Sequence, residues 1–237
     1  MGERLRALIT WFLPIGRELV GEELRRHRLM VSFLLITALY AISYVPICIL
    51  IEYHSALLSI PLTFLVCIGL AFMLRKGVSM VVVCNVYLFI LSTQISWLWI
   101  STGGLTGSPN DQAFSALFPV IALLLLGRKW AGFWLIYSIL LVMAHAIPAI
   151  MGYPFEHGMN ENYMKTFSLI SLVGHALLLY VFVNLFETSR ERAHNDLQAA
   201  NIDLAGEKAK VETLLLNILP AEVAEELKAT EIGRAHV

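Results

Sequence analysis

Long apolar segments alternate with short polar ones through the middle of the chain. Most of these segments have about twenty residues, enough for a helix to cross a hydrocarbon core of ~30 Å at ~1.5 Å per residue. The pattern therefore predicts an all-α membrane protein whose residues 29–186 form a six-helix transmembrane domain. The predicted spans are 29–51, 56–74, 78–100, 112–126, 130–151 and 166–186. The fourth span is short and contains Pro119, so we expect it to be kinked or only slightly tilted.

The charges of the connecting loops predict the orientation of the spans. Alternate loops are basic: Arg75-Lys76, Arg128-Lys129, and Arg190 with Arg192. The opposite loops carry Glu52, Asp111, Glu156 and Glu161, with Lys165 as their only cation. Because cytoplasmic loops are enriched in Lys and Arg, both termini are predicted to be cytoplasmic. We expect a multi-pass protein of the inner or plasma membrane.

The overall composition supports a membrane protein. Hydrophobic residues make up 58% of the chain, and charged residues make up 15%, well below the roughly 25% of soluble domains. The three cysteines, Cys48, Cys67 and Cys84, all lie in apolar segments and indicate neither a disulfide framework nor a metal site. The lipid bilayer is the expected partner, and no nucleic-acid partner is expected.

Residues 1–28 form a basic, amphipathic cytoplasmic segment with a short apolar patch at residues 8–13. The patch includes Trp11 and Phe12, but it is too short to span a bilayer. Two interpretations stay open. The segment is an interfacial helix on anionic lipid, or it is a solvated helix that precedes the first span.

After Phe186 the pattern becomes polar and helical. Apolar residues recur every seven positions, and Leu214 adds a partner position. The seven-residue series is Leu197, Leu204, Val211 and Ile218. This spacing predicts a coiled-coil signalling helix over residues 187–219. The alternative is a single solvated amphipathic helix.

The predicted coiled coil ends at Pro220, because proline lacks the N–H that an α-helix interior needs. The string around it reads Leu-Leu-Asn-Ile-Leu-Pro at 215–220, followed by Ala-Glu-Val-Ala-Glu-Glu-Leu-Lys at 221–228. This string resembles the segment that precedes the catalytic domain of class III adenylyl and guanylyl cyclases. By that resemblance, residues 220–231 begin the cyclase linker helix, and the chain forms a parallel homodimer.

The resemblance also implies what the rest of such a protein does. The family's catalytic domain converts ATP or GTP to the cyclic nucleotide and pyrophosphate, with two divalent metals (Mg or Mn) at a dimer interface. None of its catalytic or metal-binding residues is present in these 237 residues, and no cofactor is expected in them. Residues 232–237 resemble the translation of a sequencing adapter, so we expect a fragment of a longer cyclase.

Polar side chains within the spans are the candidates for a functional site. Gln94, His145 and His175 lie at depths that agree within ~8 Å, and Asn85 and Tyr87 are weaker members of the set. Three interpretations stay open: hydrogen bonds that hold the bundle together, a small-molecule pocket, or a metal or haem held by the two histidines.

No catalytic motif accompanies these residues, so the chain itself is not expected to catalyse a reaction. Other functions remain as alternatives. One is the input module of a histidine kinase or a diguanylate cyclase, and another is a small six-helix transporter. The predicted spans contain no Asp, Glu, Lys or Arg, which counts against an ion-coupled transporter.

Overall fold

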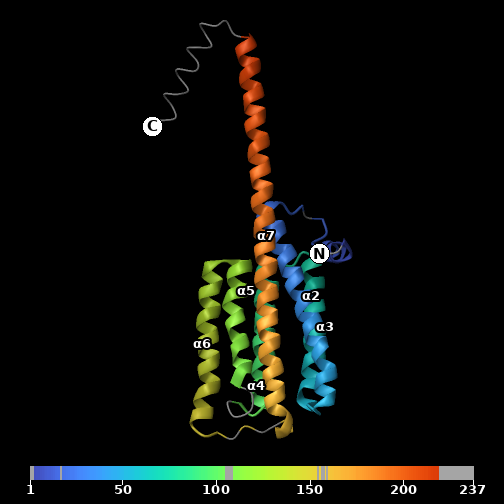
Figure 1. The fold of residues 1–237 in the computed structure, drawn as a ribbon, viewed down its shortest axis with the longest axis vertical. Helices are drawn as coiled ribbons and strands as arrows, with labels where there is room; N and C mark the ends of the chain where they lie inside the picture. The colour runs from blue at the N-terminus through green and yellow to red at the C-terminus, as the bar shows by residue number, and fades with distance from the viewer. Residues whose placement is uncertain are drawn as a thin grey trace. The chain divides into compact units, whose positions relative to one another are not determined.

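The computed structural model describes residues 3–16, 18–104, 109–153, 155, 158 and 160–218 of the chain, and these residues are mostly helical (Figure 1). Backbone contacts divide the chain into two units, Met1–Ser189 and Arg190–Val237. The elements in chain order are α1 (Glu3–Trp11), α2 (Gly21–Leu50), α3 (His54–Arg75), α4 (Met80–Ser101), η2 (Pro109–Ala116), α5 (Leu117–Leu126), α6 (Arg128–Ile150) and α7 (Glu161–Ile218).

The first unit is a helix bundle with transmembrane character. Within the described residues, five helices are long and apolar enough to cross a membrane: α2, α3, α4, α6 and α7. Their outer faces expose large apolar side chains, such as Leu58 at 81% and Ile150 at 78%. A soluble monomer rarely exposes so much contiguous apolar surface. The predicted helical fold with membrane-length apolar helices is confirmed, whereas the number of spans stays a prediction.

The fourth predicted span differs in structure from the other five. Instead of one α-helix over 112–126, the chain forms the 3₁₀-helix η2 and then the ten-residue helix α5. Pro119 lies in the first turn of α5, where its missing N–H disrupts no helical hydrogen bond. The expected kink inside an α-helix is therefore absent from α5. At the other end, Gly127 has a φ of 92° and separates α5 from α6.

Helix α2 begins eight residues before the first predicted span, at Gly21. The carboxylate of Glu22 accepts hydrogen bonds from Arg25 (2.6 Å) and Arg26 (2.8 Å). These pairs are three and four residues apart, the spacing at which opposite charges support a helix. The charged residues before Leu29 therefore extend the helix beyond the apolar segment.

The basic N-terminal segment folds onto the bundle rather than forming one separate helix. Ile9 of α1 and Phe12 just after it are both 5% exposed and belong to the main hydrophobic core. The guanidinium of Arg75, at the end of α3, lies 3.8 Å from the ring centre of Trp11. The apolar residues Ile9 and Phe12 therefore pack against the bundle, whereas both interpretations of the segment, an interfacial helix on lipid and a solvated helix before the first span, stay predictions. Contact with lipid stays open, since Trp11 is 48% exposed.

In the second unit, the described chain is the α7 portion from residue 190 to 218. Leu197, Leu204, Val211 and Leu214 are each more than half exposed in this single chain. The side chain of Ile218, the proline at 220 and the segments 220–231 and 232–237 lie outside the described residues. The coiled coil and the helix break therefore stay predictions.

Candidate functional site

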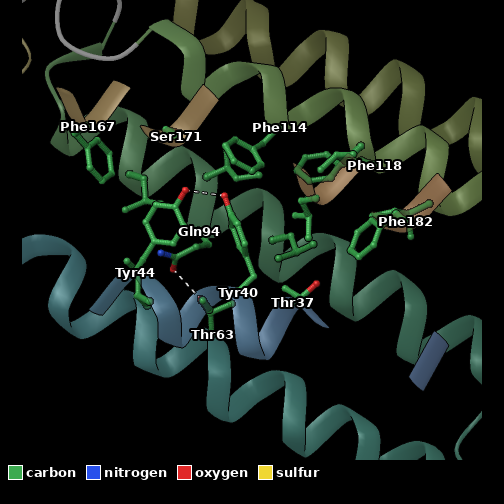
Figure 2. Close-up of a pocket in the computed structure, with 18 residues that line it drawn as sticks. Thr37, Tyr40, Tyr44, Thr63, Gln94, Phe114, Phe118, Phe167, Ser171 and Phe182 are labelled. Carbon is green, nitrogen blue, oxygen red and sulfur yellow. Dashed lines mark hydrogen bonds between the residues drawn. The ribbon is translucent and has the colours of Figure 1, made fainter. Parts of the chain in front are cut away.

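A cavity of about 110 Å³ lies inside the first unit, and its walls come from α2, α3, α4, η2, α5 and α7 (Figure 2). Its surface is almost wholly apolar. The lining residues labelled in Figure 2 are Thr37, Tyr40, Tyr44, Thr63, Gln94, Phe114, Phe118, Phe167, Ser171 and Phe182. The cavity is partly open to the surface of the bundle. Apolar clefts between the helices of a bundle are common places for small-molecule binding, so this cavity is the candidate site.

Gln94 is the one sequence-predicted site residue that lines the cavity. Its side-chain amide joins α4 to α3. The Oε1 atom accepts a hydrogen bond from Thr63 at 3.1 Å, and the Nε2 atom donates to the hydroxyl of Ser59 at 3.0 Å. Gln94 is thus bonded through both ends of its amide, which is how a polar side chain is accommodated among apolar helices.

Two tyrosines on α2, Tyr40 and Tyr44, line the cavity and contact α7. The hydroxyls of Tyr40 and Tyr44 are hydrogen-bonded at 2.8 Å, as the dashed line in Figure 2 shows, and Tyr44 also donates to the carbonyl of Ile170 at 3.4 Å. Beside this carbonyl, α7 has Gly174. A β-carbon at that position would overlap both tyrosine hydroxyls. The absence of a side chain at Gly174 therefore lets the tyrosine pair reach the α7 backbone.

Two of the other predicted residues lie one contact away from the cavity. Tyr87 is 1% exposed, and its hydroxyl forms a hydrogen bond of 2.6 Å with the hydroxyl of Thr37, a lining residue. The ring of His175 lies edge-on to Phe114, another lining residue, with 4.6 Å between ring centres. Neither Tyr87 nor His175 itself lines the cavity.

Asn85 and His145 lie at a different place, between α4 and α6. Asn85 accepts a hydrogen bond from the indole of Trp134 at 2.9 Å and donates to the carbonyl of Val81 at 2.7 Å. The ring of His145 lies 4.9 Å from that of Trp99, which is fully buried. The five predicted residues are therefore not all brought together in one pocket.

The structure also identifies site residues that the sequence analysis missed. Tyr40, Tyr44 and Gly174 link α2 to α7 beside the cavity. A signal was present, since two tyrosines four residues apart share one helix face within an apolar segment. Nothing local marks Gly174, because its role depends on which helix packs against it.

Two further contacts between α2 and α7 lie beyond the tyrosine pair, toward Arg25 on α2 and Phe186 on α7. The rings of Phe33 and Phe182 stack with centres 4.3 Å apart. The guanidinium of Arg25 lies over the ring of Phe186, 5.2 Å from its centre. Helix α2 thus contacts α7 at successive levels from the tyrosine pair to Phe186, the last residue of the sixth predicted span.

No group of three or more His, Cys, Asp or Glu side chains that could hold a metal ion occurs in the part of the chain that the structure describes. The two histidines proposed as metal or haem ligands contact different aromatic partners, Trp99 and Phe114. A scan against protein-family models, a search of curated proteins and a search of solved structures each found no match to the chain.

Proposed function

We propose that this chain is the membrane anchor, sensor and dimerisation region of a class III adenylate or guanylate cyclase. The observation that carries the proposal is the string Leu-Leu-Asn-Ile-Leu-Pro at 215–220, followed by the alanine- and glutamate-rich residues 221–228. This string resembles the entry to the catalytic domain of that family. In such a protein the catalytic domain binds two divalent metals and forms the cyclic nucleotide from ATP or GTP.

The continuity of α7 supports the proposal. One helix, Glu161–Ile218, contains both the apolar segment 166–186 and the polar segment that leads to the cyclase-like string. A helix without a break can carry a rotation or shift over its length, whereas a flexible linker cannot. The helix thus offers a direct mechanical path from a membrane bundle to a following domain.

The lengths of η2 and α5 support six spans with both termini cytoplasmic. The η2 residues within the predicted fourth span, 112–116, rise about 10 Å at ~2.0 Å each, and the ten residues of α5 rise about 15 Å at ~1.5 Å each. End to end they reach about 25 Å, a few Å less than the hydrocarbon thickness, and a bilayer accommodates a mismatch of this size by local thinning. A sixth crossing at this point gives the basic loops one common side, the cytoplasm.

The exposed apolar series on α7 supports a parallel homodimer. Leu197, Leu204 and Val211 are 59%, 53% and 55% exposed, and their seven-residue spacing places them along one face of the helix. Pairing two copies through this face would bury the apolar series. A cyclase site built between two chains needs such a pairing to bring its two halves together.

The coding sequence downstream of residue 228 in the source genome tests the proposal. A class III catalytic domain, with its pair of metal-binding aspartates, is the expected continuation. The expressed full-length protein should then form cyclic AMP or cyclic GMP in a metal-dependent assay. A following H-E-x-x-N-P motif would instead assign the chain to a histidine kinase, and G-G-[DE]-E-F would assign it to a diguanylate cyclase; either result would overturn the proposal.

A further inference from the structure

We infer that the bundle cavity binds an uncharged hydrocarbon group of roughly benzene size, seated between α2 and α7. The inference concerns binding alone and does not depend on which domain follows the chain. The cavity volume is about 110 Å³. An engineered apolar cavity of about 150 Å³ stays dry and binds benzene or xenon, so a group of about six carbon atoms matches the space.

The chemistry of the walls selects an apolar ligand. The polar side chains around the cavity are already bonded to one another: Gln94 to Thr63 and Ser59, and Tyr40 to Tyr44. An ion or a sugar would lose its hydration on entry and gain no equivalent hydrogen bonds, which makes its binding unfavourable. A hydrocarbon loses no hydrogen bonds and gains dispersion contacts with the surrounding rings.

The side chains that line the cavity are also fixed by contacts of their own. Phe114 and Phe118 enter from the η2–α5 segment, whereas Phe167 and Phe182 enter from α7, so the rings are fixed to separate backbones (Figure 2). Phe182 is stacked on Phe33, and the tyrosine pair is held against α7. Because these contacts fix the walls independently, a ligand can fill the cavity without displacing them.

Two sources can supply such a hydrocarbon group: a free lipophilic small molecule, or the end of a lipid acyl chain. Both would enter from the surrounding bilayer, and both present the same chemistry to the cavity. The test therefore has one arm for each source.

Photolabelling of the purified full chain in lipid nanodiscs tests the inference. In one arm the probe is a free six-carbon alkyl diazirine, and in the other it is a phospholipid with a diazirine at the end of its acyl chain. Labelled residues are mapped by mass spectrometry. We expect labelling by at least one probe on the lining stretches around Tyr40–Tyr44 of α2 and Phe167–Phe182 of α7. Excess toluene should suppress it there but not on the lipid-exposed face of α6.

Cavity-filling variants supply the controls. Ala41→Leu on α2 and Leu91→Phe on α4 add volume at two lining positions, and each should reduce cavity labelling at least fivefold. Ala176→Leu adds the same group as Ala41→Leu at an exposed position on α7 and should leave labelling unchanged.

Circular dichroism and size-exclusion chromatography identify any variant that fails to fold, and the other cavity-filling variant then decides. If only the free probe labels the lining residues, the natural ligand is a free small molecule. If the lipid probe labels them, the ligand is the end of an acyl chain. Labelling that is equal in filled and unfilled proteins, or absent from the lining residues, would overturn the inference.

Discussion

The hydroxyl of Tyr44 on α2 lies against the bare backbone of Gly174 on α7, where any β-carbon would overlap it. The same hydroxyl donates a hydrogen bond to the carbonyl of Ile170, one turn earlier on α7. Small residues at helix contacts allow such close approach in membranes, where packing rather than water exclusion drives association. This contact is therefore a specific point at which α7 is held in the bundle.

Replacing Gly174 with alanine should weaken the contact between α2 and α7. The added methyl would push against both tyrosine hydroxyls, and overpacking of this kind costs about 1–3 kcal/mol. The apparent melting temperature in detergent should fall by about 2–10 °C.

Two further variants separate a local clash from a general effect of losing glycine. Gly132→Ala, on α6, adds the same methyl where no atom beyond its chain neighbours and the adjacent backbone of its own helix lies within 4 Å, and should not lower the melting temperature. Removing both hydroxyls (Tyr40→Phe and Tyr44→Phe) should restore part of the stability lost in Gly174→Ala. A Gly174→Ala protein as stable as the wild type would show that the contact is not limiting.

The hydrogen bond between Gln94 and Thr63 should be measurable as a coupling between α4 and α3. Gln94→Leu and Thr63→Val each remove one partner while keeping a similar shape. Interhelical hydrogen bonds in membranes average about 0.6 kcal/mol, so a double-mutant cycle on unfolding free energy should give a coupling of about 0.5–1 kcal/mol. A coupling near zero would mean that Gln94 serves the bundle through packing alone.

The helices could be predicted from the sequence because membrane-length apolar segments separated by charged loops leave few alternatives. The helix boundaries were less predictable where local interactions act against the hydropathy pattern. The Glu22–Arg25 pair extends α2 beyond its apolar segment, and the residues before Leu117 form a 3₁₀-helix rather than an α-helix. Hydropathy reports neither an ion pair within a helix nor the choice between two helix types.

The cavity was harder to predict from the sequence than the polar residues near it. Gln94 stands out because amides are rare within spans, and it does line the cavity. The estimated depth of His145 resembles that of Gln94, but its ring packs on Trp99 between α4 and α6. Depth along a helix can be counted from the sequence, whereas the face that meets a particular neighbour depends on how the helices pack.

The loops that carry Gly104 and Gly158 should lie on the same side of the membrane. The N–H of Gly158 donates to the carbonyl of Ser101 at 2.7 Å, which places the chain before α7 beside the end of α4. Reporter fusions after Gly104 and after Gly158 should both read as extracytoplasmic, and a fusion after Arg128 should read as cytoplasmic. A cytoplasmic signal at Gly158 would remove the fifth or the sixth span from the proposed topology.

The proposed homodimer should be detectable by disulfide cross-linking in membranes. Leu204→Cys places a thiol in the seven-residue series, whereas Ile202→Cys places one on another face of the same helix, where Ile202 is 71% exposed. The native Cys48, Cys67 and Cys84 are buried in the bundle and should not compete. Oxidation should yield much more covalent dimer for Leu204→Cys. Equal yields would argue against a defined helix pairing.

Insertions into α7 of the full-length protein test the central proposal most directly, because they ask whether this helix controls a cyclase. One residue inserted before Leu214 rotates everything downstream by about 100°, whereas seven residues nearly restore the original face. Cyclic nucleotide formation is the measurement. We expect the single insertion to change the rate at least fivefold and the seven-residue insertion to stay within about twofold of wild type. Equal rates in both variants, or no cyclase activity in the full-length protein without an insertion, would contradict the proposal that α7 controls a cyclase.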